Sequence, residues 1–190
     1  MRDFEFPIAA IVYADGVYPD RVIAEAIAPL REQGLQLAGA LQVEPASRGR
    51  HPCDMLLEDL ASGEVHAIAE DRGSQARGCR LDVGLLTEIG ENVLHSLYDD
   101  SPVLLVVNKF GKIEGDGGGM RQAIAEAVDR GIPVLVGVPA RNLDRWRAFV
   151  GPLSREIPAE AEAIAGWLRD CGITGLADPR EWLEGTVRAV

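Results

Sequence analysis

Two short apolar runs, joined by a glycine-rich loop and a helical stretch, constrain the fold of this chain most strongly. PVLLVV at 102–107 and IPVLVGV at 132–138 have the length and the branched side chains of buried strands. Between them, apolar residues at helical spacing predict a helix that includes Ile124 and Val128. A strand, a helix and a strand joined over this length form a parallel crossover unit, whereas antiparallel neighbours need only a short turn. The core is therefore predicted to be α/β.

The rest of the chain extends this pattern. FPIAAIVY at 6–13 predicts another buried strand, and we expect it to lie parallel to 103–108 and 132–138 in one sheet. From 53 to 70, two apolar-rich runs flank Ala-Ser-Gly-Glu, which has turn chemistry, so this segment predicts an inserted antiparallel β-hairpin. After residue 151 we expect only helices, at 158–171 and again from Asp178.

Chain length and net charge indicate how many domains the chain forms and which binding partners are disfavoured. The chain has 190 residues, which suits one domain, and its formal charge of −11 opposes binding to nucleic acid or to an anionic membrane surface. It has no apolar run of membrane-spanning length and no signal-peptide pattern, so we expect a cytoplasmic location. The composition is compatible with a monomer or a homo-oligomer.

The loop after the first strand is the first candidate site, because ligands of open α/β sheets bind beyond the carboxyl ends of the strands. Asp15 and Gly16 lie in this loop, which spans 13–20. It has one glycine and lacks the Lys-Ser/Thr pair that reaches phosphate and magnesium. Two interpretations stay open: an ordinary strand-to-helix turn, and a degenerate anion site.

The second candidate site follows the strand at 103–108. Of the 19 basic residues only two are lysines, Lys109 and Lys112, and both lie within the four residues that follow Asn108. Because a compact ammonium and a planar guanidinium are not interchangeable in a tight site, this placement favours an anion site, with chance placement as the alternative.

Glycines and arginines are the other candidates for anion binding. Gly117, Gly118 and Gly119 precede a predicted helix, whose free N–H groups favour an anion; a plain flexible connection is the alternative. Arg80 is the last arginine of an arginine-rich loop. Two interpretations of this loop stay open: its guanidinium groups bind an oxyanion, or they are simply solvated.

A metal site is weakly indicated. His51, Cys53 and Cys79 offer ligand types that suit zinc, but no Cys-x-x-Cys or paired-histidine spacing supports them. Two alternative interpretations stay open: buried, chemically inert thiols, and a redox-active or nucleophilic thiol. We therefore predict no metal centre and keep these three residues as weak candidates.

Four stretches carry a resemblance to a known family: CDMLLEDL, GCRLD, LLVVNKFGKIEGDGGGMR and GIPVLVGVPARNLDRWRAF. They resemble a bacterial family of uncharacterised proteins that is distantly similar to thermophile-type nucleoside triphosphatases of the P-loop class. The resemblance covers about residues 6–151 and implies a P-loop-like, three-layer α/β domain at 1–151. We expect the helices predicted after it to form a helical extension at 152–190 that packs on this domain. The resemblance also implies a genetic context near molybdate transport.

Two segments that serve hydrolysis in those triphosphatases differ in this chain. The resemblance implies a phosphate loop at 13–20, which is missing, and an acidic Asp-Glu pair where Asn108 and Lys109 stand. We therefore expect a catalytically degenerate protein, not an enzyme, that binds a small oxyanion such as molybdate. The alternatives are a nucleotide-binding protein or active triphosphatase with an unusual phosphate loop, and an acidic adaptor or scaffold.

Overall fold

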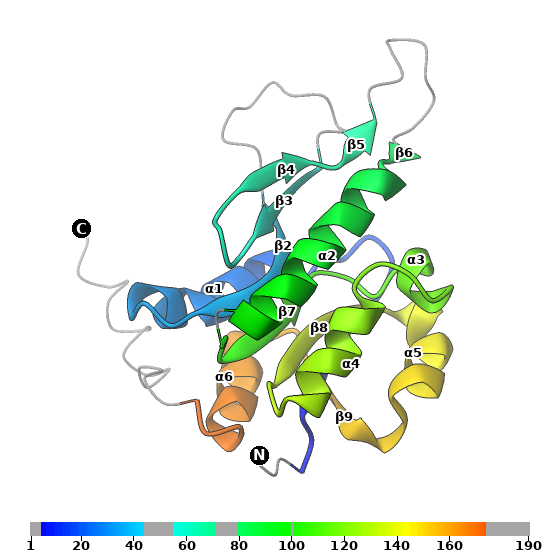
Figure 1. Cartoon of the computed structure of the whole chain (residues 1–190). Coiled ribbons are helices and arrows are strands. Elements are labelled where there is room, and N and C mark those ends of the chain that lie inside the picture. Colours follow the sequence, from blue (N-terminus) through cyan, green and yellow to red (C-terminus); the bar gives the residue numbers. More distant parts are fainter. Residues whose placement is uncertain (1–4, 44–54, 71–79, 100, 174–190) are drawn as a thin grey trace, which may run out of the picture.

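The central strands of the sheet coincide with the apolar runs that predicted them. The computed structural model describes residues 5–43, 55–70, 80–99 and 101–173, and seven strands form its main sheet (Figure 1). Their order is β4-β3-β2-β7-β8-β1-β9. The strands are β1 Ile8–Tyr13, β2 Leu37–Val43, β3 Leu56–Asp59, β4 Val65–Ala67, β7 Leu104–Val107, β8 Val134–Pro139 and β9 Ser154–Ile157.

The five strands from β2 to β9 in this order run parallel. β8 pairs in parallel with both β7 and β1, β2 pairs in parallel with β7, and β9 pairs in parallel with β1. Every residue of β7 and β8 is buried, as expected of a parallel sheet that is covered on both faces. The predicted parallel arrangement of 6–13, 103–108 and 132–138 is confirmed.

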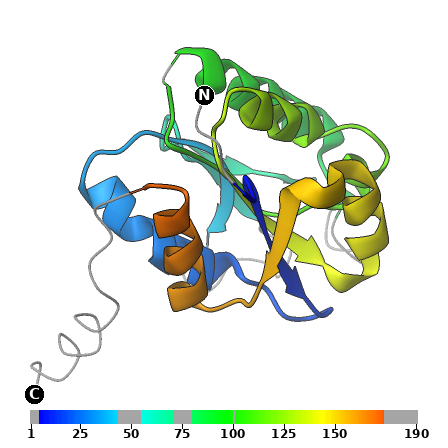
Figure 2. The same cartoon turned by 90° about the horizontal axis from the view of Figure 1, so that it is seen from below.

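Helices cover both faces of the sheet and make three layers. α1 and α6 lie side by side on one face, and their apolar side chains, including Ile27 and Trp167, pack on Ile11 and Leu104 (Figure 2). α2, α4 and α5 cover the other face. The predicted mainly parallel α/β architecture is thus confirmed. The helices are α1 Asp20–Glu32, α2 Val83–Asp99, α4 Arg121–Asp129, α5 Leu143–Val150 and α6 Ala161–Asp170.

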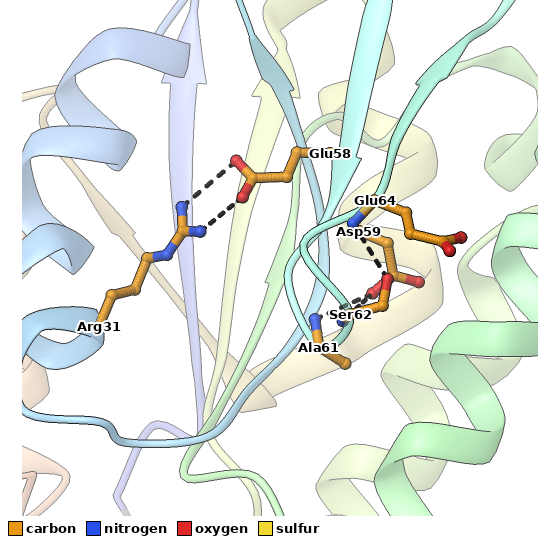
Figure 3. A network of polar contacts seen from close by, with 6 residues as sticks. All are labelled: Arg31, Glu58, Asp59, Ala61, Ser62 and Glu64. Carbon is orange, nitrogen blue, oxygen red and sulfur yellow. Dashed lines mark hydrogen bonds and ion pairs between the residues drawn. The ribbon is translucent and has the colours of Figure 1, made fainter.

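The predicted hairpin is present as β3 and β4, which pair antiparallel with each other, while β3 pairs antiparallel with β2. The carboxylate of Asp59, buried to 6 % exposure, accepts hydrogen bonds from the N–H groups of Ala61 (2.9 Å) and Ser62 (3.2 Å) in the turn. Figure 3 shows these bonds and the bidentate ion pair of Arg31 on α1 with Glu58 on β3 (2.5 and 3.3 Å). The hairpin is therefore tied to the body of the domain on its α1 side.

The structure also differs from the sequence predictions. The segment after 151 is not purely helical, because Ser154–Ile157 forms the edge strand β9; the predicted helix from Asp178 lies outside the described residues. Several short elements were not expected from the sequence. They are the helix α3 Lys112–Gly115, the 3-10 helices Ala140–Asn142 and Gly151–Leu153, and an antiparallel pair of strands, β5 Ala69–Glu70 and β6 Arg80–Leu81.

No helix within the described ranges combines the length and the apolar character that crossing a membrane requires.

Gly137 in β8 determines the path of the chain after β7. The N–H of Phe110 donates to the Gly137 carbonyl oxygen (2.8 Å), so the turn that begins at Asn108 crosses over β8. A Cβ atom at position 137 would overlap the carbonyl oxygen of Asn108. The two lysines that follow Asn108 are thus placed by a residue without a side chain on the neighbouring strand.

We predict that Gly137→Ala destabilises the fold by about 1–3 kcal/mol, because the added methyl group must displace the Asn108 backbone. The free energy of unfolding in urea measures this. Gly166→Ala is the matched control: position 166 lies inside α6 with no backbone contact for the added methyl group, so alanine should stabilise by about 0.5–1 kcal/mol. Equal stabilities of the two variants would contradict the crossing constraint.

Candidate functional site

Three loops meet at the carboxyl edge of the parallel strands. The loop after β1 is joined to the one after β8 by an ion pair of Asp15 with Arg141. The loop after β8 is joined to the one after β7 because the side-chain N–H of Asn142 donates to the carbonyl oxygen of Phe110 (2.8 Å). Parallel strands bring their carboxyl ends to one edge, where ligands of such sheets bind. The candidate site lies there.

A pocket of about 290 Å³ opens at this edge. Its apolar residues come mainly from β2, β3, β6, β7, the start of α2 and the residues around α3. Its polar residues come from β2, from α3 and from the loops after β7 and β8. The apolar residues are Ala40, Met55, Leu57, Ile68, Leu81, Leu86, Val107, Ile113 and Met120, and the others are Gln42, Asn108, Lys109, Gly111, Lys112, Glu114, Arg141 and Asn142.

Both lysines of the chain line this pocket. Lys109 is half-buried and Lys112 is exposed. Within the described part of the chain, neither ammonium has a hydrogen-bond or ion-pair partner, although Lys109 lies near enough to Asp20 to act on its carboxylate electrostatically. Arg141, in contrast, is already paired with Asp15. Two positive charges are therefore available to an anion in the pocket.

Glu114 is the acidic residue of the pocket, and the backbone holds its carboxylate. The carboxylate accepts hydrogen bonds from the N–H groups of Gly111 (2.8 Å) and Met120 (3.4 Å). Gly119, whose φ is +56°, lies against the same carboxylate so closely that any Cβ atom there would overlap it. Glu114 thus satisfies backbone donors at the starts of α3 and α4, and within the described residues it forms no ion pair with either lysine.

Burial acts on two further groups at this edge. It raises the pKa of Tyr13 to about 12, and the Asp20 carboxylate adds to this rise, so the phenol is neutral at physiological pH. Burial also raises the pKa of Asp20 above its usual value, while its own backbone N–H and the Lys109 ammonium oppose the rise. Asp20 is the first residue of α1. Its charge is therefore costly in the folded protein and is partly compensated by Lys109.

The structure brings some of the predicted site residues together. Asn108, Lys109 and Lys112 share the pocket. Asp15 is connected to it through Arg141, and Gly16 lies in the same loop with a φ of +83°. The residues at 117–119 are not part of the pocket wall, and of the three only Gly119 lies against the Glu114 carboxylate.

The remaining candidates are Arg80 and the three weak metal ligands. The backbone of Arg80 begins β6, next to Leu81 in the pocket wall, and its side chain lies outside the described residues. His51, Cys53 and Cys79 lie outside them entirely. Among the residues that are described, no three histidine, cysteine or acidic side chains are grouped so that they could hold a metal ion.

Sequence reasoning missed Arg141, Asn142 and Gln42 as members of the pocket wall. The first two lie two and three residues after Pro139, the last residue of β8, so the rule that ligands bind after strand ends would have found them. That rule does not apply to Gln42, because this residue lies within β2 and not after its end.

Comparison with known proteins identifies the family. The model of a family described as protein of unknown function (DUF2478) matches residues 8–167. The chain belongs to this family. Among curated proteins, the DUF2478 chain is 31 % identical over 163 residues to the molybdenum import ATP-binding protein ModC 2 of Bradyrhizobium diazoefficiens. That match covers 86 % of this chain but only 18 % of the relative, so the chain spans less than a fifth of that protein.

Solved structures define the fold class. The DUF2478 chain is similar to the crystal structure of THEP1 from the hyperthermophile Aquifex aeolicus, with a TM-score of 0.58, 15 % identity, and coverage of 82 % of this chain and 91 % of that one. It is also similar to the solution structure of a human cancer-related nucleoside triphosphatase, with a TM-score of 0.54, 17 % identity, and coverage of 87 % and 94 %. The fold is therefore that of P-loop nucleoside triphosphatases, as the resemblance implied.

We predict that Asp20→Asn raises the stability of the protein at pH 7. Because burial raises the pKa of Asp20 in the folded state, ionisation costs stability as the pH rises through that pKa, and asparagine avoids this cost. The gain should disappear as the pH falls below the usual pKa of an aspartate. Thermal unfolding between pH 3 and 7 measures it. Asp144→Asn is the control, because it removes a carboxylate from an exposed position in the first turn of α5.

Proposed function

We propose that this protein binds a small oxyanion in the pocket at the carboxyl edge of its sheet and does not hydrolyse nucleoside triphosphates. The observation that carries the proposal is the pair of ammonium groups, Lys109 and Lys112. Both line the pocket, and neither has a hydrogen-bond or ion-pair partner within the part of the chain that the structure describes. Charge-assisted hydrogen bonds to an anion are the interactions that such groups make.

Loss of hydrolysis is supported by the loops themselves. Phosphoryl transfer on this fold relies on backbone donors, a lysine and a Ser/Thr between the first strand and the first helix. In this chain the corresponding loop ends in Pro19 and Asp20, and its Asp15 is paired with Arg141. After β7, where an acidic pair handles magnesium and water in related triphosphatases, Asn108 and Lys109 stand instead. This exchange favours an anion over a cation.

Molybdate is the first choice of ligand. The name of the Bradyrhizobium relative refers to molybdenum import, and this chain is similar to a portion of that protein. The same name refers to ATP binding, and the pocket has an apolar wall, so a nucleotide phosphate is the second candidate. A cytoplasmic location and self-association remain parts of the proposal.

The first experiment identifies the anion and its site. A thermal-shift screen with molybdate, tungstate, sulfate, phosphate and nucleotides selects the ligand, since a ligand at 100 times its dissociation constant adds about 2.7 kcal/mol of stability. Calorimetric titration should then show that Lys109→Ala and Lys112→Ala each weaken binding about ten- to a hundredfold, through loss of a charge-assisted hydrogen bond.

Two further variants sharpen this test. Lys112→Arg should restore binding poorly, because a planar guanidinium does not fill the place of an ammonium. Arg155→Ala removes the same charge from the exposed edge strand β9, away from the pocket, and should bind like the wild type. If the two lysine-to-alanine variants also bind like the wild type, the pocket is not the anion site.

The second experiment tests the loss of hydrolysis. We predict that the purified protein releases phosphate from ATP and GTP, with magnesium present, no faster than the Lys112→Ala variant does. A magnesium-dependent turnover of about 0.1 per second, near the low end for enzymes, that the Lys112→Ala variant lacks would show an active triphosphatase with an unusual phosphate loop.

A further inference from the structure

The pocket is larger and more apolar than an inorganic oxyanion needs. Its volume of about 290 Å³ lies at the lower end for small-molecule sites, which run from about 300 to 1,000 Å³. A tetrahedral oxyanion, one central atom with its oxygens, would occupy only the end beside the lysines. The apolar remainder would stay lined by side chains such as Leu57 and Ile68 with no ligand atoms against them.

Most of the apolar wall comes from segments other than the one that carries the lysines, and the exceptions are Val107, Ile113 and Met120. Ala40, Leu57, Leu81 and Leu86 belong to β2, the inserted strands and α2, whereas both lysines follow β7. One ligand that touches both walls must therefore carry an apolar body at one end and a negative group at the other. Two methionines, Met55 and Met120, also line the pocket, and their unbranched side chains adapt to ligands of varied shape.

The charges of the pocket indicate how negative that group is. Arg141 is paired with Asp15, and Glu114 accepts hydrogen bonds from backbone N–H groups, which leaves the two ammonium groups to the ligand. A monocarboxylate would match only one of them. A phosphate monoester, which carries a charge of about −1.5 to −2 at pH 7, matches both.

We propose that the ligand is an organic phosphate monoester, with its phosphate at Lys109 and Lys112 and an apolar ring or chain against the wall formed by Met55, Leu81 and Met120. This inference rests on the proposed function, because it assumes that the two lysines form the anion site. It adds that the oxyanion arrives attached to an apolar body.

The methionines provide a direct test. The chain has three, of which two line the pocket. In protein labelled with ¹³C at the methionine methyl groups, 1-naphthyl phosphate should shift the Met55 and Met120 signals, because an aromatic ring placed against them changes their local field. Met55→Leu and Met120→Leu assign the signals. Inorganic phosphate at saturation should move both signals far less. Equal responses to the two probes would overturn the inference.

Calorimetry supplies the second measurement. Burial of the naphthyl ring should make 1-naphthyl phosphate bind about ten- to a hundredfold more tightly than inorganic phosphate. Leu81→Ser, at a position that is 38 % exposed and so tolerant of a polar side chain, should reduce the ratio of ester affinity to phosphate affinity about three- to tenfold. Val83→Ser, at an exposed position outside the pocket wall, is the control and should change neither affinity.

The outcomes separate this inference from the proposed function. If inorganic anions bind through the lysines but the naphthyl ester binds no more tightly, the inference fails and the proposed function stands. If the ester binds more tightly but Leu81→Ser does not weaken it, the apolar body lies elsewhere and the inference also fails. If neither probe binds and molybdate does not bind either, both fail.

Discussion

Asn108 joins β2 to the end of β7 at the edge where the pocket opens, and the geometry of the site depends on it. Its backbone N–H donates to the Ala40 carbonyl oxygen (3.0 Å), and its side-chain Oδ1 accepts from the N–H of Gln42 (2.9 Å). The side chain thereby continues the β2–β7 ladder beyond the end of β7. An aspartate could accept the same bond, but its charge would lie beside Lys109. An amide fixes the turn and leaves the ammonium available.

This arrangement produces a local positive site in a protein whose formal charge is −11. Acidic residues are present at the same edge, but within the described residues none of them forms an ion pair with Lys109 or Lys112. Asp15 pairs with Arg141, Glu114 accepts backbone N–H groups, and Asp20 begins α1, where burial raises its pKa. The overall negative charge slows the approach of an anion, whereas the lysines favour it once it has arrived. Salt screens both the overall repulsion and the local attraction, so anion binding to this pocket need not weaken at high salt.

Sequence alone predicted the parallel core, because runs such as 102–107 are apolar throughout, as strands covered on both faces are. It missed β9, since Arg155 and Glu156 are exposed and such an edge strand has little apolar signal. At the site, residue composition located the two lysines, and the strand-end rule located their loop. The anion site predicted at Gly117, Gly118 and Gly119 stays a prediction, and only coordinates reveal that the Glu114 carboxylate lies against Gly119. Contacts between distant segments, such as Asp15 with Arg141, have no local sequence signal.

The ends of the main sheet limit how this protein can associate with copies of itself. The two outermost strands are β4, with three residues, and β9, with four. On β9, charged side chains are engaged with neighbouring helices, Glu156 with Arg147 of α5 and Arg155 with Asp170 of α6. Short edges that carry charge offer an incoming strand few backbone groups to pair with. An assembly of copies would therefore use helix or loop surfaces rather than one continuous intermolecular sheet.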